Sequence, residues 1–157
     1  MWTKEISTIS NATAKTIWQI YIDIPKWTDW HDNILECHIV GPFEPGSKGA
    51  MTVQGNPRPL PFVLLEVQDE IMFTDLTEIP GATIVVAHHL ERTSEGTRIT
   101  HKVTISGPAW EQIATTLGKQ LEHGLPQTIE LLARLAEKHE LANNAYDASH
   151  ETRRISV

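Results

Sequence analysis

The sequence contains one cysteine, Cys37, among its 157 residues, so no disulfide bond can form within the chain. We therefore expect a reducing compartment and interpret Cys37 as a small buried apolar residue. No stretch approaches the roughly 20 apolar residues of a membrane span, and the first residues lack the apolar segment of a signal peptide. These absences predict a cytoplasmic protein that does not insert into membranes.

Basic residues are also scarce. Lys and Arg together number 13 against 20 Asp and Glu, which gives a formal net charge of −7. Nucleic acid and anionic membrane surfaces are bound through clustered Lys and Arg, so neither is expected as a partner. The sequence also lacks a phosphate-binding glycine loop, a Ser-His-Asp pattern and the ligand spacing of a zinc site. We accordingly expect no cofactor and no metal.

What the chain does contain is typical of one globular domain, with 40% hydrophobic and 21% charged residues. Segments rich in β-branched residues alternate with turn residues and predict strands along most of the chain. The predicted strands are seven in number and cover residues 2–10, 34–40, 48–54, 62–68, 71–78, 82–92 and 97–106. Their connections are too short for parallel crossovers, so neighbouring strands are expected to be antiparallel.

Helical periodicity appears after the first strand and again after the last one. A helix capped by Asn11 or Thr13 is expected to run to about Ile22, and a short helix or turn follows at 26–31. The longest periodic segment spans about 109–141. Its apolar face consists of Trp110, Ile113, Leu117, Leu121, Thr128, Leu132 and Leu135.

Pro126 lies inside this long segment and is expected to kink the helix near Gly124, because proline cannot donate a hydrogen bond to the Glu122 carbonyl. Gly124 falls on the apolar face, where the absence of a side chain would leave a gap in the core. The kink fits equally well a helix that only follows a curved sheet, so both interpretations stay open. Residues 143–157 are polar and lack periodicity, so we expect a domain over 1–142 followed by a polar C-terminal tail.

Four pieces of the sequence, in this order and spacing, carry a resemblance to a known superfamily. They are NATAKTIW at 11–18, DIPKWTDW at 23–30, GPFEPGSKG at 41–49 and LEHGLPQTIELLARLAE at 121–137. The chain resembles the SRPBCC superfamily of START-like helix-grip proteins, in its polyketide cyclase/dehydratase-like branch. That family usually has proline where Thr13 stands, a departure that affects only the start of the first helix.

The resemblance implies an α+β helix-grip fold. In this fold a curved seven-stranded antiparallel sheet wraps around a long C-terminal helix, with two short helices after the first strand. The resemblance further implies a cavity for an apolar or amphipathic ligand between the sheet and that helix. It carries over no shared catalytic motif, so the activity has to be argued from this chain's own residues.

The last two predicted strands allow a prediction of their register. Period-two alternation and the 93–96 loop pair Leu90 with Ile99, His88 with His101, Val86 with Val103, and Ile84 with Ile105. Every apolar residue then meets an apolar partner on the inward face. The two histidines are expected to be cross-strand neighbours with Cβ atoms roughly 4.5–5.5 Å apart. A slip of two residues would separate them while keeping both inward.

A pair of inward imidazoles suits ligand recognition, because burial and mutual repulsion disfavour the charged form. A neutral imidazole can donate and accept one hydrogen bond each, to a ligand or in proton transfer. Alternatively, His88 and His101 bond each other, the backbone or water within the core. A metal site would need a third ligand, and no spacing ties Asp75 or Glu36 to the pair.

The leading hypothesis from the sequence is a module that binds a small hydrophobic or aromatic molecule in an internal cavity. The candidate ligand-binding residues are His88, His101, Trp27, Trp30, Val86, Val103, Leu117, Leu121 and Gly124. One alternative is a cyclase, dehydratase or isomerase that uses His88 and His101 as general acid and base. The other alternative is a protein-interaction module. The identity of the ligand and the presence of a homodimer stay open.

Overall fold

The computed structural model of the chain describes the backbone of residues 1–155 and the side chains as far as Glu151. The strands are β1 (Trp2–Ser10), β2 (Ile34–Val40), β3 (Lys48–Val53), β4 (Leu60–Gln68), β5 (Met72–Ile79), β6 (Ala82–Thr93) and β7 (Gly96–Ser106). The helical segments are α1 (Ala14–Ile22), η1 (Ile24–Asp29), α2 (Trp110–Ile113), η2 (Ala114–Gly118) and α3 (Lys119–Ile155).

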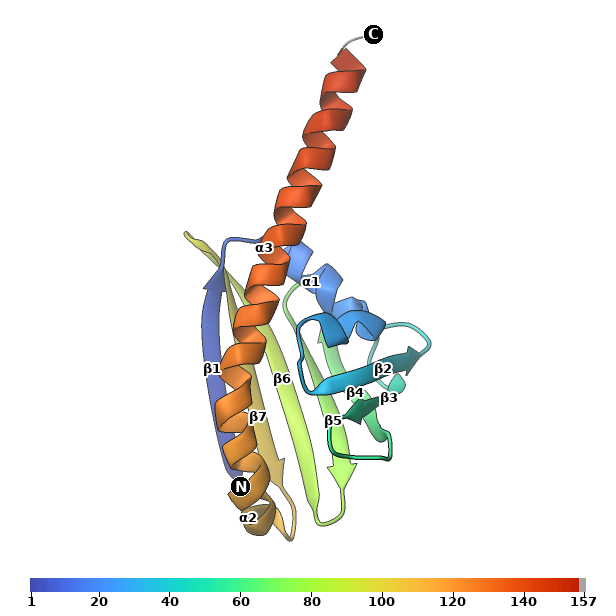
Figure 1. Cartoon of the computed structure of the whole chain (residues 1–157), viewed down its shortest axis with the longest axis vertical. Coiled ribbons are helices and arrows are strands. Elements are labelled where there is room, and N and C mark those ends of the chain that lie inside the picture. Colours follow the sequence, from blue (N-terminus) through green and yellow to red (C-terminus); the bar gives the residue numbers. More distant parts are fainter. Residues whose placement is uncertain (156–157) are drawn as a thin grey trace.

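The seven strands form one sheet in the order β1-β7-β6-β5-β4-β3-β2. All neighbouring strands are antiparallel, as predicted from the short connections. The sheet curves, and α3 lies across its concave face alongside β1 and β7 (Figure 1). The predicted α+β helix-grip fold is therefore confirmed.

The segment after β1 folds as its sequence predicts. Thr13 caps α1, because its side-chain oxygen accepts a hydrogen bond from the Thr16 backbone N–H at 3.2 Å. The apolar stripe of this helix, which includes Trp18 and Tyr21, is buried. Pro25 sits in the first turn of η1, where a missing N–H costs nothing. The two short helical segments α1 and η1 thus follow β1, as predicted.

Hydrogen bonds link one side of α3 to β1 and to the start of α1. Glu130 accepts a hydrogen bond from the Thr8 hydroxyl of β1 at 2.5 Å, and the Ser10 hydroxyl donates to the Ala133 carbonyl at 3.0 Å. Further along, Glu140 accepts from the Thr13 backbone N–H at 2.7 Å. Between them, Glu137 accepts from the Asn11 backbone N–H at 3.1 Å. The four acceptors thus recur at three- and four-residue steps, so one flank of α3 faces β1 and the start of α1.

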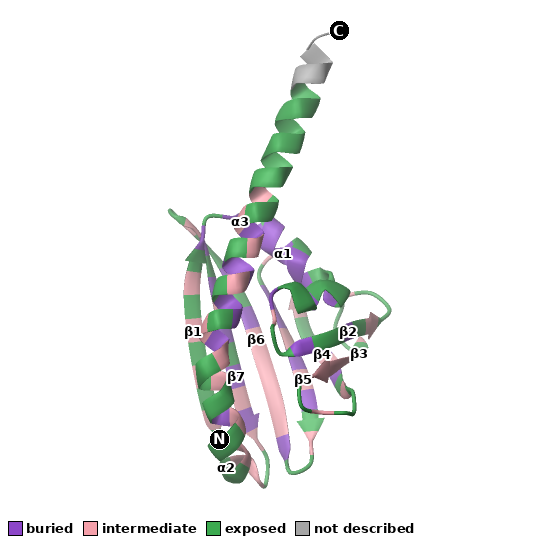
Figure 2. Cartoon of the chain, in the orientation of Figure 1, coloured by how far each residue is buried: buried purple, intermediate pink, exposed green. Residues whose placement is uncertain are grey.

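The last helix differs from its prediction at both ends. Its beginning is not a regular α-helix, because η2 widens the turns at Ala114–Gly118 into a π-helical segment. The α-helix α3 then continues through Pro126 and beyond the expected end at 141, as far as Ile155. Residues 141–151 are all exposed and project away from the sheet (Figures 1 and 2). Among the described residues, no helix is both long enough and apolar enough to cross a membrane.

Candidate functional site

The hairpin of β6 and β7 has the predicted register. His88 pairs with His101, Val86 with Val103, Ile84 with Ile105 and Leu90 with Ile99. Both histidines point to the concave face and are buried, with 5% and 2% of their surfaces exposed. Their ring centroids lie 4.7 Å apart in an edge-to-face arrangement. The expected juxtaposition of two inward imidazoles is therefore confirmed.

Each histidine has a partner within the protein. The Nδ1 atom of His88 lies 3.3 Å from the Phe73 carbonyl oxygen, so Nδ1–H donates and Nε2 stays an acceptor in the neutral ring. The His88 ring also stacks on Phe73, with centroids 3.9 Å apart. His101 Nε2 shares a hydrogen bond of 2.8 Å with the Tyr21 hydroxyl. A backbone partner was one of the alternatives left open by the sequence, and for His88 the structure contains it.

Burial keeps both imidazoles neutral at pH 7. Desolvation lowers the pKa of His101 to about 3, with a smaller contribution from His31. Desolvation also lowers the pKa of His88 well below its usual value, and the neighbouring His101 adds to this effect. The pair can therefore donate and accept hydrogen bonds but supplies no positive charge to the interior.

A third polar group, Asp75, lies beside the histidines. It sits on the inner face of β5, opposite Val86 of β6, and only 4% of its surface is exposed. Its Oδ2 atom is 4.0 Å from His88 Nδ1, beyond hydrogen-bond range. Desolvation raises the pKa of the Asp75 carboxyl to about 7. Asp75 and His88 are close, but the neutral imidazole does not balance the carboxylate charge.

The position of Asp75 beside the histidines was not predicted, although the sequence contains a signal for it. The Pro80-Gly81 turn pairs Ile79 with Ala82, and counting back along both strands sets Asp75 against Val86. The same register argument that placed the histidines would therefore have brought Asp75 next to them. The turn thus marks more than the boundary between two strands, because it also fixes which residues face each other.

The two candidate tryptophans lie deep in the structure. Trp27 and Trp30 are 3% and 1% exposed, and their ring centroids are 5.8 Å apart. Trp27 Nε1 donates to the Tyr21 carbonyl oxygen at 2.9 Å, and its ring lies 6.4 Å from that of His88. Within the described part of the chain, the buried Trp30 Nε1 and His31 Nδ1 have no hydrogen-bond partner. Both tryptophans thus form the aromatic wall beside the histidines.

Cys37 also belongs to this buried region, as its apolar interpretation predicts. It lies on β2 and is unpaired and buried. Burial, and to a lesser degree the Asp75 carboxylate, raises the pKa of the Cys37 thiol to about 12. The group is therefore a neutral thiol at pH 7.

The other candidate residues lie where the last helix and β6 leave apolar surface uncovered. Val103 is buried, whereas Val86 and its strand neighbour Ile84 are half-buried although both face inward. Figure 2 shows this half-buried stretch along β6. On the helical side, Leu117, Leu121 and Gly124 are likewise half-buried. A Cβ atom added at Gly124 would meet no other atom within 4 Å.

These residues share one side of the interior. Positions 117, 121, 124, 128, 131 and 135 follow one another at three- and four-residue steps, on the flank of the helix opposite to Glu130 and Ala133. A Cβ atom added at Gly118 would lie 3.2 Å from the Trp2 ring, so this part of the helix is close to Trp2. Trp2 pairs with Ile105 of β7, and Ile105 pairs with Ile84 of β6. Leu117, which precedes Gly118, therefore lies near the level of Ile84, and Leu121 and Gly124 follow on the same flank of the helix. We call Ile84, Val86, Leu117, Leu121 and Gly124 the inner apolar surface.

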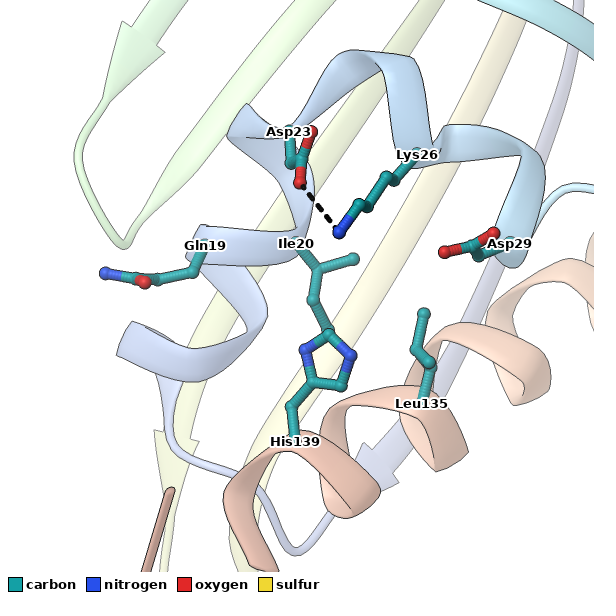
Figure 3. Close-up of a pocket in the computed structure, with 7 residues that line it drawn as sticks. All are labelled: Gln19, Ile20, Asp23, Lys26, Asp29, Leu135 and His139. Atoms are coloured by element: carbon teal, nitrogen blue, oxygen red, sulfur yellow. Dashed lines mark ion pairs between the residues drawn. The ribbon is translucent and has the colours of Figure 1, made fainter. Parts of the chain in front are cut away.

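Two hollows on the outside of the molecule do not involve the candidate residues. One, of about 180 Å³, lies between α1, η1 and α3, and is lined by Gln19, Ile20, Asp23, Lys26, Asp29, Leu135 and His139 (Figure 3). Lys26 and Asp23 form an ion pair of 3.9 Å at its rim. The other, of about 450 Å³, is an open depression lined by Val40 and residues 44–48. Among the described residues, no group of three or more His, Cys, Asp or Glu side chains is placed to hold a metal ion.

Most of the chain also matches the sequence profile of a known family. The profile described as "Polyketide cyclase / dehydrase and lipid transport" matches residues 1–137. The chain belongs to this family. The expected resemblance to SRPBCC-type proteins is therefore confirmed. A search among curated proteins found no significant match.

Solved structures similar to this family member share its fold at low sequence identity. Protein NE0264 from Nitrosomonas europaea has a TM-score of 0.70 and 21% identity, with 88% of this chain and 96% of that chain covered. Protein MLL2253 from Mesorhizobium loti has a TM-score of 0.70 and 15% identity, covering 87% and 98%. Norcoclaurine synthase from Thalictrum flavum, solved with dopamine and hydroxybenzaldehyde, has a TM-score of 0.68 and 15% identity, covering 88% and 87%. At these identities the likeness concerns the fold alone.

Proposed function

We propose that this protein binds a small hydrophobic or aromatic molecule over the inner apolar surface, with His88 and His101 as polar groups beneath it. The observation that carries the proposal is the incomplete burial of inward-facing apolar residues. Ile84 and Val86 are half-buried, while Ile105 and Val103, their partners on β7, are 0% and 1% exposed. A ligand that covers about 100 Å² of such surface gains roughly 2.5 kcal/mol.

The missing side chain at Gly124 supports the same proposal. The position faces the same side as Leu117 and Leu121, and a Cβ atom there would meet open space. Glycine costs helix stability, so its presence inside α3 is expected to have a compensating use. Room for a ligand beside the helix is such a use.

The proposal is tested by filling that space. A neutral fluorescent apolar probe such as Nile red is titrated into the wild-type protein and into Gly124→Leu and Gly124→Ala. We expect the probe to bind the wild type and Gly124→Ala, and to bind Gly124→Leu at least tenfold more weakly. The alanine variant is the matched control, because it shares the gain in helix propensity but adds only a methyl group. Equal binding by all three proteins, or no binding by the wild type, would refute the proposal.

A second candidate function, acid–base catalysis of a cyclase, dehydratase or isomerase type, is favoured by one observation. The Asp75 carboxyl has a pKa raised to about 7 by burial and lies 4.0 Å from a neutral imidazole. Such a pair can accept and return a proton near neutral pH. Native mass spectrometry of freshly purified protein would identify a co-purified molecule. Its conversion, followed by chromatographic separation of substrate and product, should then be lost in Asp75→Asn while its binding is kept.

A further inference from the structure

Asp75 differs from the other charged residues that the structure describes. Within the described residues it is the only buried carboxylate, and no Lys or Arg is buried. An isolated charge in the interior is costly unless a partner of opposite sign approaches it. The surroundings of Asp75 therefore decide what kind of molecule the interior can accept.

No group around Asp75 supplies a positive charge. From β6 it faces Val86 and is close to His88, whose imidazole is neutral. Its cross-strand partner on β4 is the apolar Leu64. The Cys37 thiol of β2, which interacts with the Asp75 charge, is itself neutral at pH 7.

The groups further away are also uncharged. His101 and His31 have pKa values lowered by burial to about 3 and about 4, and burial raises the pKa of Tyr21. Across the sheet, Asp75 pairs with Val86 of β6, Val86 with Val103 of β7, and Val103 with Lys4 of β1. Lys4 is therefore three strands away from Asp75, which corresponds to roughly 14 Å. The protein thus leaves the carboxylate without a counter-ion.

Asp75 is bordered on one side by aromatic rings and on the other by the inner apolar surface. Its neighbours on the inner face of β5 are Phe73 and Thr77, and Trp27 lies 5.9 Å from Phe73 and 6.0 Å from Phe62, ring centroid to ring centroid. Such rings favour an organic cation near their faces. The cross-strand partner of Asp75 is Val86, which belongs to the inner apolar surface.

We infer that the ligand of this protein is an amine with an apolar or aromatic body: its ammonium group pairs with Asp75, and its body covers the inner apolar surface. The inference rests on the proposed function, because it concerns the same site. The ammonium group provides the counter-charge that none of the described side chains provides. A neutral molecule of the same shape leaves the Asp75 carboxylate unpaired, so the site discriminates between the two by charge.

The test compares ligands of the same body that carry either an ammonium or a hydroxyl group. Two matched pairs, 2-phenylethylamine with 2-phenylethanol and tryptamine with tryptophol, are titrated calorimetrically at pH 8 into the wild-type protein. We expect the amine of at least one pair to bind tenfold or more tightly than its alcohol, a difference of about 1.4 kcal/mol. In Asp75→Asn the amine should lose this advantage, while the alcohol keeps its affinity. Glu78→Gln removes an exposed carboxylate from the same strand and should change neither affinity.

A measurement on the wild type alone guards against a folding defect of Asp75→Asn. Because the carboxylate has to be ionised, amine binding should weaken as the pH falls from 8 to 6, whereas alcohol binding should not change. Nile red binding without any preference for amines would overturn the inference and leave the proposed function standing. Absence of binding by the probe and by every ligand would overturn both. An amine preference that persists in folded Asp75→Asn would assign the charge recognition to another group and overturn the inference as well.

Discussion

Replacing Gly124 by alanine should stabilise the protein, and the size of the effect follows from two features of the structure. Gly124 lies inside α3, where glycine is less favourable than alanine by about 0.8–1.0 kcal/mol. The added methyl group would meet no atom within 4 Å, so no steric cost offsets this gain. For a chain of this size, 1 kcal/mol raises the melting temperature by roughly 2–4 °C.

Thermal unfolding followed by circular dichroism, with urea unfolding as a second measure, is the appropriate assay for Gly124→Ala. A rise of about 1 kcal/mol in the free energy of unfolding, at constant dependence on urea, would agree with the reasoning. An unchanged or lowered stability would refute it, because it would mean that the added methyl group meets a neighbour. The same result would remove the support that Gly124 lends to the proposed ligand site.

Three further predictions concern the interior. Between pH 8 and 5 the free energy of unfolding of Asp75→Asn should fall relative to that of the wild type by about 2.6 kcal/mol, because the raised pKa of about 7 makes the folded wild type take up a proton that its unfolded chain does not bind. An equal difference between the two proteins at both pH values would contradict this. Tyr21→Phe should cost about 1–3 kcal/mol in urea unfolding, since it leaves His101 Nε2 without its partner; a loss below about 0.5 kcal/mol would argue against the hydrogen bond. Gly49→Ala should lower the melting temperature by more than any of these, because its Cβ would overlap the Phe62 ring and the His38 carbonyl oxygen; an unchanged melting temperature would show that both neighbours move aside.

The sheet was predictable because its signals are local and mutually consistent. Strand alternation has a period of two, and the short loops fix the register of each hairpin, so the pairing of His88 with His101 could be deduced from the sequence alone. The capping of α1 by Thr13 was predictable for the same reason, since it depends on residues three apart.

The end of α3 was not predictable from periodicity. Residues 141–151 are exposed on all sides, so no apolar stripe marks them as helical. Their helix continues because several are good helix formers and because the helix has already begun within the domain, which removes the cost of nucleation. The absence of an apolar stripe therefore indicates that this segment does not pack against the domain, but it does not indicate that the segment is not helical.

The site was predictable only where it depends on neighbouring strands. Trp27 of η1, one of the two residues of the aromatic wall, contacts Phe62 of β4 and Phe73 of β5, and these contacts depend on how η1 packs onto the sheet. No spacing along the sequence encodes such packing. The burial that raises the pKa of Asp75 likewise arises from several elements at once.

The one-sided fastening of α3 has a consequence for how a molecule could enter. The hydrogen bonds described between its side chains and the rest of the domain run from Glu130, Glu137 and Glu140 to β1 and the start of α1. Gly124 lies on the opposite edge of the helix, next to open space. A molecule that reached the interior along that edge would therefore leave these hydrogen bonds intact and would displace only apolar contacts.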